Sequence, residues 1–466
     1  MKSETYNGLR AICGRDAVLT DPASLLGYEN DALAFRRHRP DCVVIPGSCD
    51  ELKRVIRFCR NIEFPYTLRG AGTSLSGGPV AAQGGLIIHL SRLRNILEIN
   101  EEDLFCVVEP GVVLDRLNKA LGAHGLFYPP DPSSGLSCTL GGNVAENAGG
   151  IRCFKYGVTA GYVLGLEIIL HSGEAVTLGG PAGGRGMGNG PCWKSLIVGS
   201  EGILAAISKI WLRLKPLPEK IWTFLAGFKT MDFAMDAVVQ LTRSSVMPVA
   251  LEFMDNRVVQ LVENSSFSVG LDRDRCYLLV EIDGPADLVN CQVDEVVKLL
   301  ERSGAEDCKK TSDSKQRLEL WKARKAFGGL LGQISPEIMS QDSVVPPTRI
   351  SEVLTYIYGE ADRMGVQALS AVHAGDGNMH PNFLFDAEKP GELKNIKRLG
   401  KKLMEKVVAE GGMITGEHGL GNDKLEYLPM VFTREETVFQ KALLACFNPN
   451  HRLNPGKVFS GRDFRA

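Results

Sequence analysis

The sequence predicts an α+β protein of two or three domains, and three observations support that prediction. The chain has 466 residues, more than one ordinary hydrophobic core accommodates. A strand at 43–46, a helix, and a strand at 65–69 lead into a glycine loop at 70–78. After Lys-Pro-Leu-Pro at 215–218, short strands alternate with long amphipathic helices, which is typical of an antiparallel sheet covered by helices.

The elements of the first part follow from apolar patterns and end signals. Residues 1–35 show weak helical periodicity. Ser48 and Glu51 predict a capping box that begins a helix ending near Arg60. Further elements are predicted as strands at 86–90, 96–100, 104–109, 163–170, 174–178 and 204–214, and as a helix at 114–124.

The second part alternates strands with helices. A capping box of Thr433 and Glu436 begins its last helix, at 434–447. The other elements are strands at 249–254, 276–282, 366–373 and 382–385, and helices at 232–244, 286–303, 313–332, 350–364 and 391–410. We therefore expect an N-terminal helical segment at 1–35, a first domain at 36–215, a second domain at 216–415 and a C-terminal segment at 416–466.

Composition and charge exclude several classes of protein. The net charge of −2 offers no basic surface for nucleic acid or an acidic membrane. The twelve cysteines are spread without Cys-x-x-Cys spacing, which indicates reduced thiols in a cytoplasmic protein and argues against an iron–sulfur cluster in this chain. The start lacks the apolar run of a secretion signal, and no apolar stretch predicts a transmembrane segment.

Three of the eight histidines, His373, His380 and His418, lie in two short glycine-flanked stretches. Glycines let the backbone fold back so that side chains can meet at one point. Two imidazoles together with Glu417 would make an open divalent metal site, and zinc, manganese and ferrous iron all suit such ligands. His418, next to this set, could move protons. Asp376 fits a turn between two glycines better than a ligand role.

The 51 glycines also cluster in loops. The loop at 70–78 follows a strand, so its backbone N–H groups could cradle a diphosphate, although its spacing fits neither the Rossmann nor the Walker pattern. Similar loops, poor in bulky side chains, occur at 109–111, 129–133, 139–143, 147–150, 155–157 and 199–203. So much bare backbone fits a fold that threads an extended dinucleotide between two subdomains.

Residues 69–202 resemble the FAD-binding domain of the vanillyl-alcohol-oxidase/p-cresol-methylhydroxylase (PCMH) superfamily. Motifs at 127–134, 141–150 and 373–381 are similar to those of FAD-linked D-2-hydroxy-acid (D-lactate) dehydrogenases, a family that includes the FAD subunit of bacterial glycolate oxidase. The resemblance implies a PCMH-type FAD-binding domain of two α/β subdomains. An FAD-linked oxidase C-terminal domain, an antiparallel sheet with helices, would follow it.

The resemblance also implies cofactor contacts, residue by residue. Thr73 stands where some relatives carry a histidine that tethers the flavin, so FAD should be non-covalent. A glycine-rich insert at 183–190 and the pair Ala205 and Ala206 depart from the family pattern. The expected FAD contacts are Arg69, Gly70, Ala71, Gly72, Thr73, Ser74 and Gly77 for the pyrophosphate, Pro132, Thr139, Gly142, Asn143, Gly149 and Gly150 for the isoalloxazine and ribityl region, Gly157, Glu201, Gly202 and Ile203 along the adenosine half, and Asn454 from the C-terminal segment.

The substrate of such an enzyme needs a base for its hydroxyl, a cation for its carboxylate and a Lewis acid for the developing alkoxide. We expect His418 to be the base and Arg324 to clamp the carboxylate bidentately. Asn382 could hydrogen-bond the carboxylate or the hydroxyl. The resemblance gives these residues, and the metal ligands His373, His380 and Glu417, the same roles.

The expected function is FAD-dependent oxidation of glycolate or D-lactate to the 2-oxo acid. Electrons would pass to a partner: an iron–sulfur subunit, a second flavin-domain subunit or an electron-transfer flavoprotein. We expect a cytoplasmic protein, or one held peripherally at the inner membrane through partner subunits. The alternatives are a stand-alone D-lactate or D-2-hydroxyglutarate dehydrogenase, a metallohydrolase, and a non-catalytic flavin-binding subunit.

Overall fold

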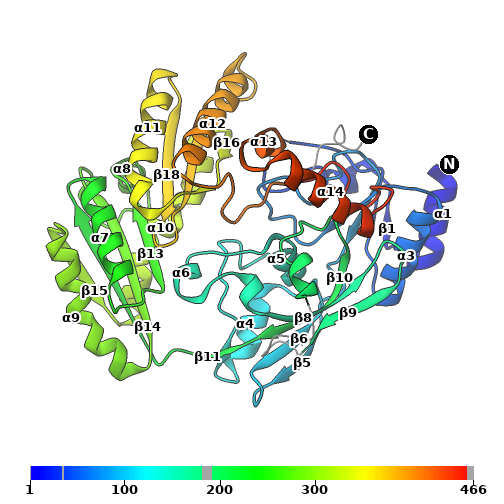
Figure 1. The fold of residues 1–466 in the computed structure, drawn as a ribbon, viewed down its shortest axis with the longest axis horizontal. Helices are drawn as coiled ribbons and strands as arrows, with labels where there is room; N and C mark the ends of the chain where they lie inside the picture. The colour runs from blue at the N-terminus through cyan, green and yellow to red at the C-terminus, as the bar shows by residue number, and fades with distance from the viewer. Residues whose placement is uncertain (1, 34–35, 181–190, 459–466) are drawn as a thin grey trace. The chain divides into compact units, whose positions relative to one another are not determined.

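The computed structural model describes residues 2–33, 36–180 and 191–458, so the glycine-rich insert at 183–190 lies outside the described residues. The chain forms two compact units, each assembled from separate stretches of sequence. Figure 1 shows the fold and labels many of the helices and strands. Unit 1 comprises Met1–Gly149, Val158–Leu217 and His418–Ala466, and unit 2 comprises Gly150–Gly157 and Pro218–Glu417.

The first sheet of unit 1 has four strands in the order β1-β2-β4-β3. Strands β2, β4 and β3 are parallel, and β1 is antiparallel to β2. The Ser48 hydroxyl caps α3 by accepting from the Glu51 amide, but the Glu51 carboxylate reaches Gly47 instead of closing the predicted box. The elements are α1 (Lys2–Cys13), β1 (Val18–Leu19), α2 (Pro22–Leu26), β2 (Cys42–Val44), α3 (Cys49–Asn61), β3 (Tyr66–Arg69) and β4 (Leu86–His89).

The second sheet of unit 1 is antiparallel throughout, in the order β5-β6-β10-β8-β9. A two-stranded ribbon of β7 and β11 lies apart from it. The elements are β5 (Ile96–Asn100), β6 (Phe105–Val108), α4 (Leu114–Gly122), β7 (Leu126–Phe127), α5 (Leu140–Glu146), β8 (Val163–Ile169), β9 (Ala175–Gly179), β10 (Ala206–Arg213) and β11 (Lys215–Pro216).

The end of the chain returns to unit 1. Leu453 pairs in parallel with Tyr66 of β3, so the last described residues extend the first sheet by one bridge. Leu453 and Tyr66 belong to the same buried core as Val55 and Ile56 of α3. Two helices precede this return, α13 (Leu428–Val431) and α14 (Arg434–Phe447).

Unit 2 is built on an eight-stranded sheet in which every recorded pair is antiparallel. Its order is β15-β12-β14-β13-β18-β19-β16, with β17 also paired to β19. The strands are β12 (Lys220–Phe228), β13 (Ala250–Met254), β14 (Cys276–Gly284), β15 (Asp307–Thr311), β16 (Glu337–Ser340), β17 (Ser343–Val344), β18 (Gln367–His373) and β19 (Asn378–Phe385).

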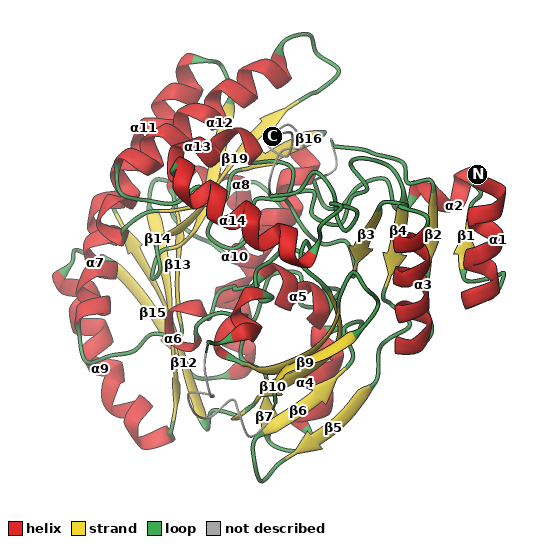
Figure 2. Cartoon of the chain, turned by 45° about the vertical axis from the view of Figure 1, so that its right-hand side comes forward, coloured by secondary structure: helices red, strands yellow, loops and turns green. Residues whose placement is uncertain are grey.

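Helices cover both faces of this sheet (Figure 2). Helices α8 and α10 pack on the face that carries Leu225, Leu279 and Leu369. Helices α7, α9, α11 and α12 contact strands of the same sheet from the other side. The helices of the unit are α6 (Cys153–Tyr156), α7 (Met231–Arg243), α8 (Asn256–Glu263), α9 (Ala286–Arg302), α10 (Ser314–Ile334), α11 (Ile350–Arg363) and α12 (Glu392–Ala409).

Both units combine sheets with helices, so the predicted α+β class is confirmed. All twelve cysteines are free thiols, as their spacing indicates. No helix within the described ranges combines the length and the apolar composition that crossing a bilayer requires.

Candidate functional site

Two adjacent strands of unit 2 carry the predicted histidine ligands. His373 is the last residue of β18, and His380 is the third residue of β19, beyond a tight turn. The predicted strand at 382–385 therefore begins earlier, at Asn378, and His380 is a strand residue. Asp376 accepts a hydrogen bond from the Asn378 amide in the turn, which confirms its turn role. Because the strands are paired in register, the imidazoles project from fixed positions on a rigid sheet.

The structure brings the two imidazoles and the Glu417 carboxylate together. Glu417 Oε1 lies 3.5 Å from His373 Nε2 and 3.3 Å from His380 Nε2. The two rings are nearly perpendicular, with their centroids 5.1 Å apart. Ligand atoms about 2.0–2.2 Å from a tetrahedral zinc ion lie about 3.3–3.5 Å apart. The observed separations thus fit three ligands of one small divalent ion, with a fourth position left for substrate or water.

Glu252 contacts Nδ1 of His373, the ring nitrogen that Glu417 does not approach. It pairs with His373 across β13 and β18, and its Oε1 lies 2.5 Å from His373 Nδ1. Its other oxygen, Oε2, accepts from Arg324 Nε and Nη2, both at 2.8 Å. A carboxylate on Nδ1 keeps the proton there and turns Nε2 toward a metal. Glu252 is 1% exposed, so this buried carboxylate joins His373, a predicted metal ligand, to an arginine.

The charges of this cluster stabilise one another. Burial alone would lower the pKa of His373, but the carboxylates of Glu252 and Glu417 outweigh it and raise that pKa to about 10. Burial would raise the pKa of Glu417, but hydrogen bonds from His373 and His380 bring it well below its usual range. In the protein without metal, the proton on His373 takes the place of a cation.

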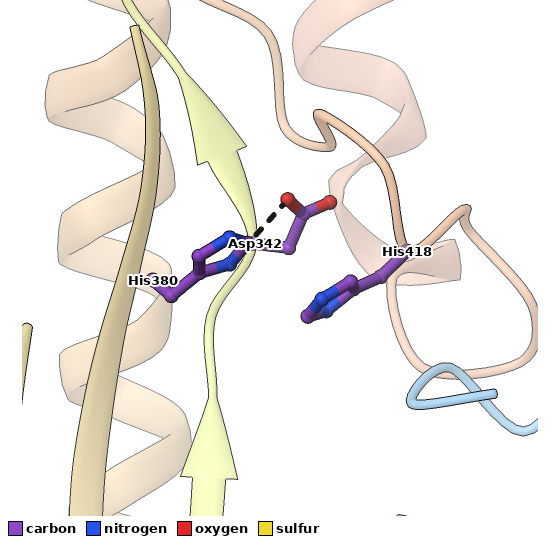
Figure 3. A group of neighbouring side chains, drawn as sticks. All are labelled: Asp342, His380 and His418. Atoms are coloured by element: carbon purple, nitrogen blue, oxygen red, sulfur yellow. Dashed lines mark ion pairs between the residues drawn. The ribbon is translucent and has the colours of Figure 1, made fainter. Parts of the chain in front are cut away.

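Asp342 organises the loop that carries Glu417. It lies between Ser340, which pairs with Asn382, and Ser343, which pairs with Met379, and this register places it opposite His380. Its Oδ1 is 3.8 Å from His380 Nδ1 (Figure 3). The fully buried carboxylate also accepts from the Thr415 hydroxyl at 2.5 Å, the Gly416 amide at 2.7 Å and the Glu417 amide at 3.1 Å.

The predicted substrate residues Arg324 and Asn382 both lie in unit 2; Asn382 is buried, and Arg324 is partly buried with its side chain 14% exposed. Glu252 Oε2 engages Nε and one N–H of Nη2 of Arg324, so it does not use Nη1 or the second N–H of Nη2. The Asn382 amide nitrogen donates to the His380 carbonyl at 2.7 Å and to the Leu369 carbonyl at 3.4 Å. With its donors used in this way, Asn382 offers its oxygen, which can accept from a hydroxyl but not bind a carboxylate.

The predicted pyrophosphate loop leaves the end of β3 in unit 1. Arg69 is buried and its side chain folds over Gly72, where a Cβ would lie 2.2 Å from the guanidinium. Gly72 also has a φ of +76°, which favours glycine. The Gly77 amide donates to Asp31 at 2.8 Å and is therefore already engaged. The remaining predicted residues of this loop are Gly70, Ala71, Thr73 and Ser74, all at least partly exposed to solvent.

Helix α5 begins beside this loop. A Cβ on Gly70 would lie 2.3 Å from the Thr139 hydroxyl, so the bare backbone of Gly70 and the residue before α5 are in contact. Thr139 occupies the N-cap position without capping the helix. The predicted loop at 139–143 is thus largely helical. Pro132, Gly142 and Gly149 complete the set expected on this side of unit 1.

Buried polar atoms without a protein partner test whether these residues fit FAD. Thr139 Oγ1, Asn143 Nδ2 and Asn454 Oδ1 have no hydrogen-bond partner among the described residues. Native proteins rarely leave such groups unsatisfied. All three belong to residues predicted to contact FAD, and all three lie in unit 1, so these polar atoms, of which Asn454 Oδ1 is an acceptor, fit a polar ligand of this kind.

The other predicted cofactor residues lie in three places. Gly150 and Gly157 bound a short stretch that belongs to unit 2, where the Tyr156 hydroxyl donates to Asp283 at 2.9 Å. Glu201, Gly202 and Ile203 follow each other in unit 1, and the Asn454 side chain donates to the Glu201 carbonyl at 2.8 Å. His418 is the first residue of the last stretch of unit 1 and directly follows Glu417.

Glu252 and Asp342 are absent from the sequence-based predictions. Each has a weak signal: Glu252 is a lone charge inside the apolar run Ala-Leu-Glu-Phe-Met, and Asp342 precedes Ser-Val-Val-Pro. An uncompensated charge in a buried strand requires a partner. The partner of Glu252 lies 121 residues away, so the sequence pattern alone does not identify it.

Comparisons with known proteins identify both parts of the chain. Residues 40–179 match the FAD binding domain, and residues 217–458 match the C-terminal domain of FAD linked oxidases. The chain is 35% identical over 439 residues to glycolate oxidase subunit GlcD of Bacillus subtilis, covering 94% of this chain and 93% of that protein. It is 33% identical over 417 residues to D-lactate dehydrogenase of Archaeoglobus fulgidus, covering 89% and 90%.

Solved structures with low sequence identity share the fold. p-Cresol methylhydroxylase matches with a TM-score of 0.81 at 16% identity, over 100% of this chain and 98% of that one. 4-Ethylphenol oxidase from Gulosibacter chungangensis matches with a TM-score of 0.78 at 17% identity, over 99% and 98%. The predicted PCMH-type architecture is confirmed, and the chain belongs to the FAD-linked oxidases, the family that includes glycolate oxidase subunits and D-lactate dehydrogenases.

Proposed function

We propose that this protein oxidises a small 2-hydroxy acid, glycolate or D-lactate, to the 2-oxo acid, with non-covalent FAD as the hydride acceptor and a divalent metal in the His373, His380 and Glu417 set. The relatives named glycolate oxidase subunit and D-lactate dehydrogenase support the reaction class. The single observation that carries the proposal is the convergence of two imidazole Nε2 atoms on one Glu417 oxygen, at 3.3 and 3.5 Å.

The metal ligands would place a cation beside the substrate hydroxyl. A zinc, manganese or ferrous ion there would act as a Lewis acid toward the substrate hydroxyl. Glu252 keeps Nδ1 of His373 protonated, and Asp342 orients the backbone of Glu417, so both ligands are held before any metal binds.

Arg324 and Asn382 account for substrate recognition. Arg324 would hold the substrate carboxylate through Nη1 and the second N–H of Nη2, because Glu252 occupies the Nε edge. Asn382 would accept from the hydroxyl through its side-chain oxygen. Both lie on regular elements of unit 2, α10 and β19, which position side chains more rigidly than loops do.

His418 would take the proton from the substrate hydroxyl. It directly follows Glu417, and consecutive Cα atoms are about 3.8 Å apart, so the base and a metal ligand share one stretch of backbone. Bound FAD would supply a two-electron acceptor for the hydride that leaves the α-carbon. Thr139, Asn143 and Asn454 would give it hydrogen bonds that their buried atoms otherwise lack.

We further propose that the electrons leave for a partner protein: an iron–sulfur subunit, a second flavin-domain subunit or an electron-transfer flavoprotein. The word subunit in the names of the glycolate oxidase relatives supports an assembly. Such partners would place the protein in the cytoplasm or hold it at the inner face of a membrane. Slow reoxidation of the reduced protein by oxygen and fast turnover with a soluble dye would support this route.

Anaerobic mixing tests the reaction. Purified protein is combined in turn with glycolate, D-lactate, L-lactate and D-2-hydroxyglutarate while the flavin absorbance is followed. Bleaching by glycolate or D-lactate supports the proposal, and preferential bleaching by D-2-hydroxyglutarate supports the alternative dehydrogenase. No bleaching by any acid, with flavin and metal both present, refutes it.

The His418→Ala variant tests the base. We expect it to keep its flavin and to be reduced about 100- to 10,000-fold more slowly, the usual contribution of a general base. A normal reduction rate would place the base elsewhere.

A further inference from the structure

Several polar contacts within unit 1 hold the backbone that follows His418. Glu201 Oε1 accepts from the Leu420 amide at 2.7 Å, and Oε2 accepts from the Gly421 amide at 2.6 Å. A buried carboxylate with both oxygens on successive backbone N–H groups fixes the orientation of that peptide.

Ser76 holds the same backbone from the FAD loop. Its hydroxyl donates to the His418 carbonyl at 2.9 Å, and its own carbonyl accepts from the Asn422 amide at 3.0 Å. Arg36 adds a third support, donating to the Asn422 carbonyl and pairing with Asp423, both at 2.7 Å. The contacts come from three stretches far apart in the sequence.

The backbone itself has little freedom to shift. Gly419 and Gly421 have φ values of +81° and +51°. A Cβ on Gly421 would lie 2.0 Å from the Ser76 carbonyl oxygen, and one on Gly419 would lie 2.7 Å from a Glu146 oxygen. Only glycines allow the chain to pass this close to the serine and the carboxylates.

Glu201 adopts a conformation that is costly for its type. Its φ is +51°, in the left-handed region that non-glycine residues avoid. Its amide donates to the Ala145 carbonyl and its carbonyl accepts from Asn454, so both neighbouring peptides are tied down. Strain of this kind persists where the surroundings fix it, often beside functional groups.

We infer that Glu201 is a positioning residue for His418: its carboxylate, with the Ser76 hydroxyl, holds the 418–422 backbone so that the imidazole is presented in one place. This inference rests on the proposed function, in which His418 is the base. It also gives Glu201 a different task from the FAD contact implied by family resemblance, because both of its oxygens are already used. Since Ser76 belongs to the predicted pyrophosphate loop at 70–78, the loop and the base would hold a common position.

The test compares Glu201→Gln with His418→Ala and the double variant. Glutamine has one acceptor oxygen, so one of the two amides loses its partner. A displacement of about 1 Å at a reacting group can cost about 100-fold in rate. We expect flavin reduction in Glu201→Gln to slow by roughly that factor, and the double variant to be no slower than His418→Ala within about twofold.

Two measurements separate positioning from a general loss of structure. Hydrogen exchange at the Leu420 and Gly421 amides should accelerate at least about tenfold in Glu201→Gln, and the Kd for FAD should stay within about threefold. The matched control is Glu263→Gln, which removes a carboxylate that likewise accepts from two amides, those of Val269 and Gly270, in unit 2. The control should leave flavin reduction unchanged.

The possible results distinguish the role of Glu201 from the role of His418. The inference about Glu201 is overturned if the double variant is slower than His418→Ala by the full factor that Glu201→Gln causes alone. It is also overturned if Glu201→Gln greatly raises the Kd for FAD but is reduced at the normal rate at saturating FAD. A His418→Ala variant that reduces normally overturns the proposed base, whatever Glu201 does. If Glu201→Gln does not fold, Ser76→Ala replaces it in the cycle, since it removes the bond to the His418 carbonyl together with the contact to the Ser74 hydroxyl. A reduction rate equal to that of the unaltered protein would then refute the inference.

Discussion

Replacing Glu252 by glutamine should weaken metal binding although the three predicted ligands stay intact. Glu252 Oε1 faces His373 Nδ1 at 2.5 Å, and Oε2 accepts from Arg324. Glutamine keeps one acceptor and turns the other into a donor, so it can serve the imidazole or the guanidinium but not both. Loss of a partner behind a metal-bound histidine typically costs about 10- to 100-fold in affinity, or about 1.4–2.7 kcal/mol.

The same change should lower stability. The Arg324 side chain is only 14% exposed, and it would lose the negative charge that balances it. Removing one partner of a buried pair costs about 3–5 kcal/mol, and the remaining glutamine oxygen should recover part of this. Adding Arg324→Met to Glu252→Gln removes the unpaired charge, so the double variant should regain stability but not metal affinity.

Chelator competition gives the metal Kd, and denaturant unfolding gives the stability. Glu281→Gln is the matched control, because Glu281 is a buried carboxylate of the same sheet that pairs with Arg317 at 2.8 Å and accepts from Trp321. The control should lose stability while keeping its metal. A Glu252→Gln variant that binds metal within about twofold of the unaltered protein would refute the reasoning.

Three further predictions concern other parts of the structure. Asp342→Asn should weaken metal binding at least about tenfold. Thr415→Val, which removes only one hydroxyl donor to the Asp342 carboxylate, should weaken metal binding less, and equal losses of affinity by chelator competition would contradict this. Gly421→Ala should destabilise the fold by clearly more than Gly411→Ala, which has a positive φ but open space around it, and equal denaturation midpoints would disprove the predicted clash. In metal-free protein, the raised pKa of His373 contributes stability that is fully present below pH 6.5 and is lost as the pH rises through about 10. Because metal binding displaces this proton, the metal affinity should increase as the pH rises from 6.5 to about 10, and an affinity independent of pH would argue against this.

Elements with local end signals could be predicted from the sequence. The helix at 434–447 is observed as Arg434–Phe447, because the capping box of Thr433 and Glu436 lies within four residues of sequence. Helix α8, Asn256–Glu263, is missing from the prediction although Asp255 caps it. It follows β13 after a single residue and is too short for a clear apolar period.

Helix α5 shows where local reasoning fails. Gly141 and Gly142 lower its intrinsic helix propensity, so the sequence favours a loop. In the structure a Cβ on Gly141 would lie 2.6 Å from Pro110, so the glycines permit close packing of a helix against a neighbouring turn. Tertiary contact, which the sequence pattern does not show, decides the conformation.

In the candidate site, too, the sequence predicts some features and not others. Two histidines and a glutamate in glycine-flanked stretches predict the ligand types. Their convergence depends on strand register and on the loop that Asp342 orders, and both arise from contacts between distant residues. The carboxylates behind the ligands could not be predicted for that reason.

The return of the chain end to unit 1 has a consequence for synthesis. The Tyr66 carbonyl accepts from the Asn454 amide, and the Tyr66 amide donates to the Arg452 carbonyl, so a strand made early pairs with residues translated after unit 2. Unit 2 lies almost wholly between these points in translation order. On the ribosome it can finish folding first, while the nucleotide-binding half remains incomplete until the C-terminal residues emerge. Truncating the chain after Leu217 to obtain a minimal FAD domain would remove Asn454 and expose the edge of β3.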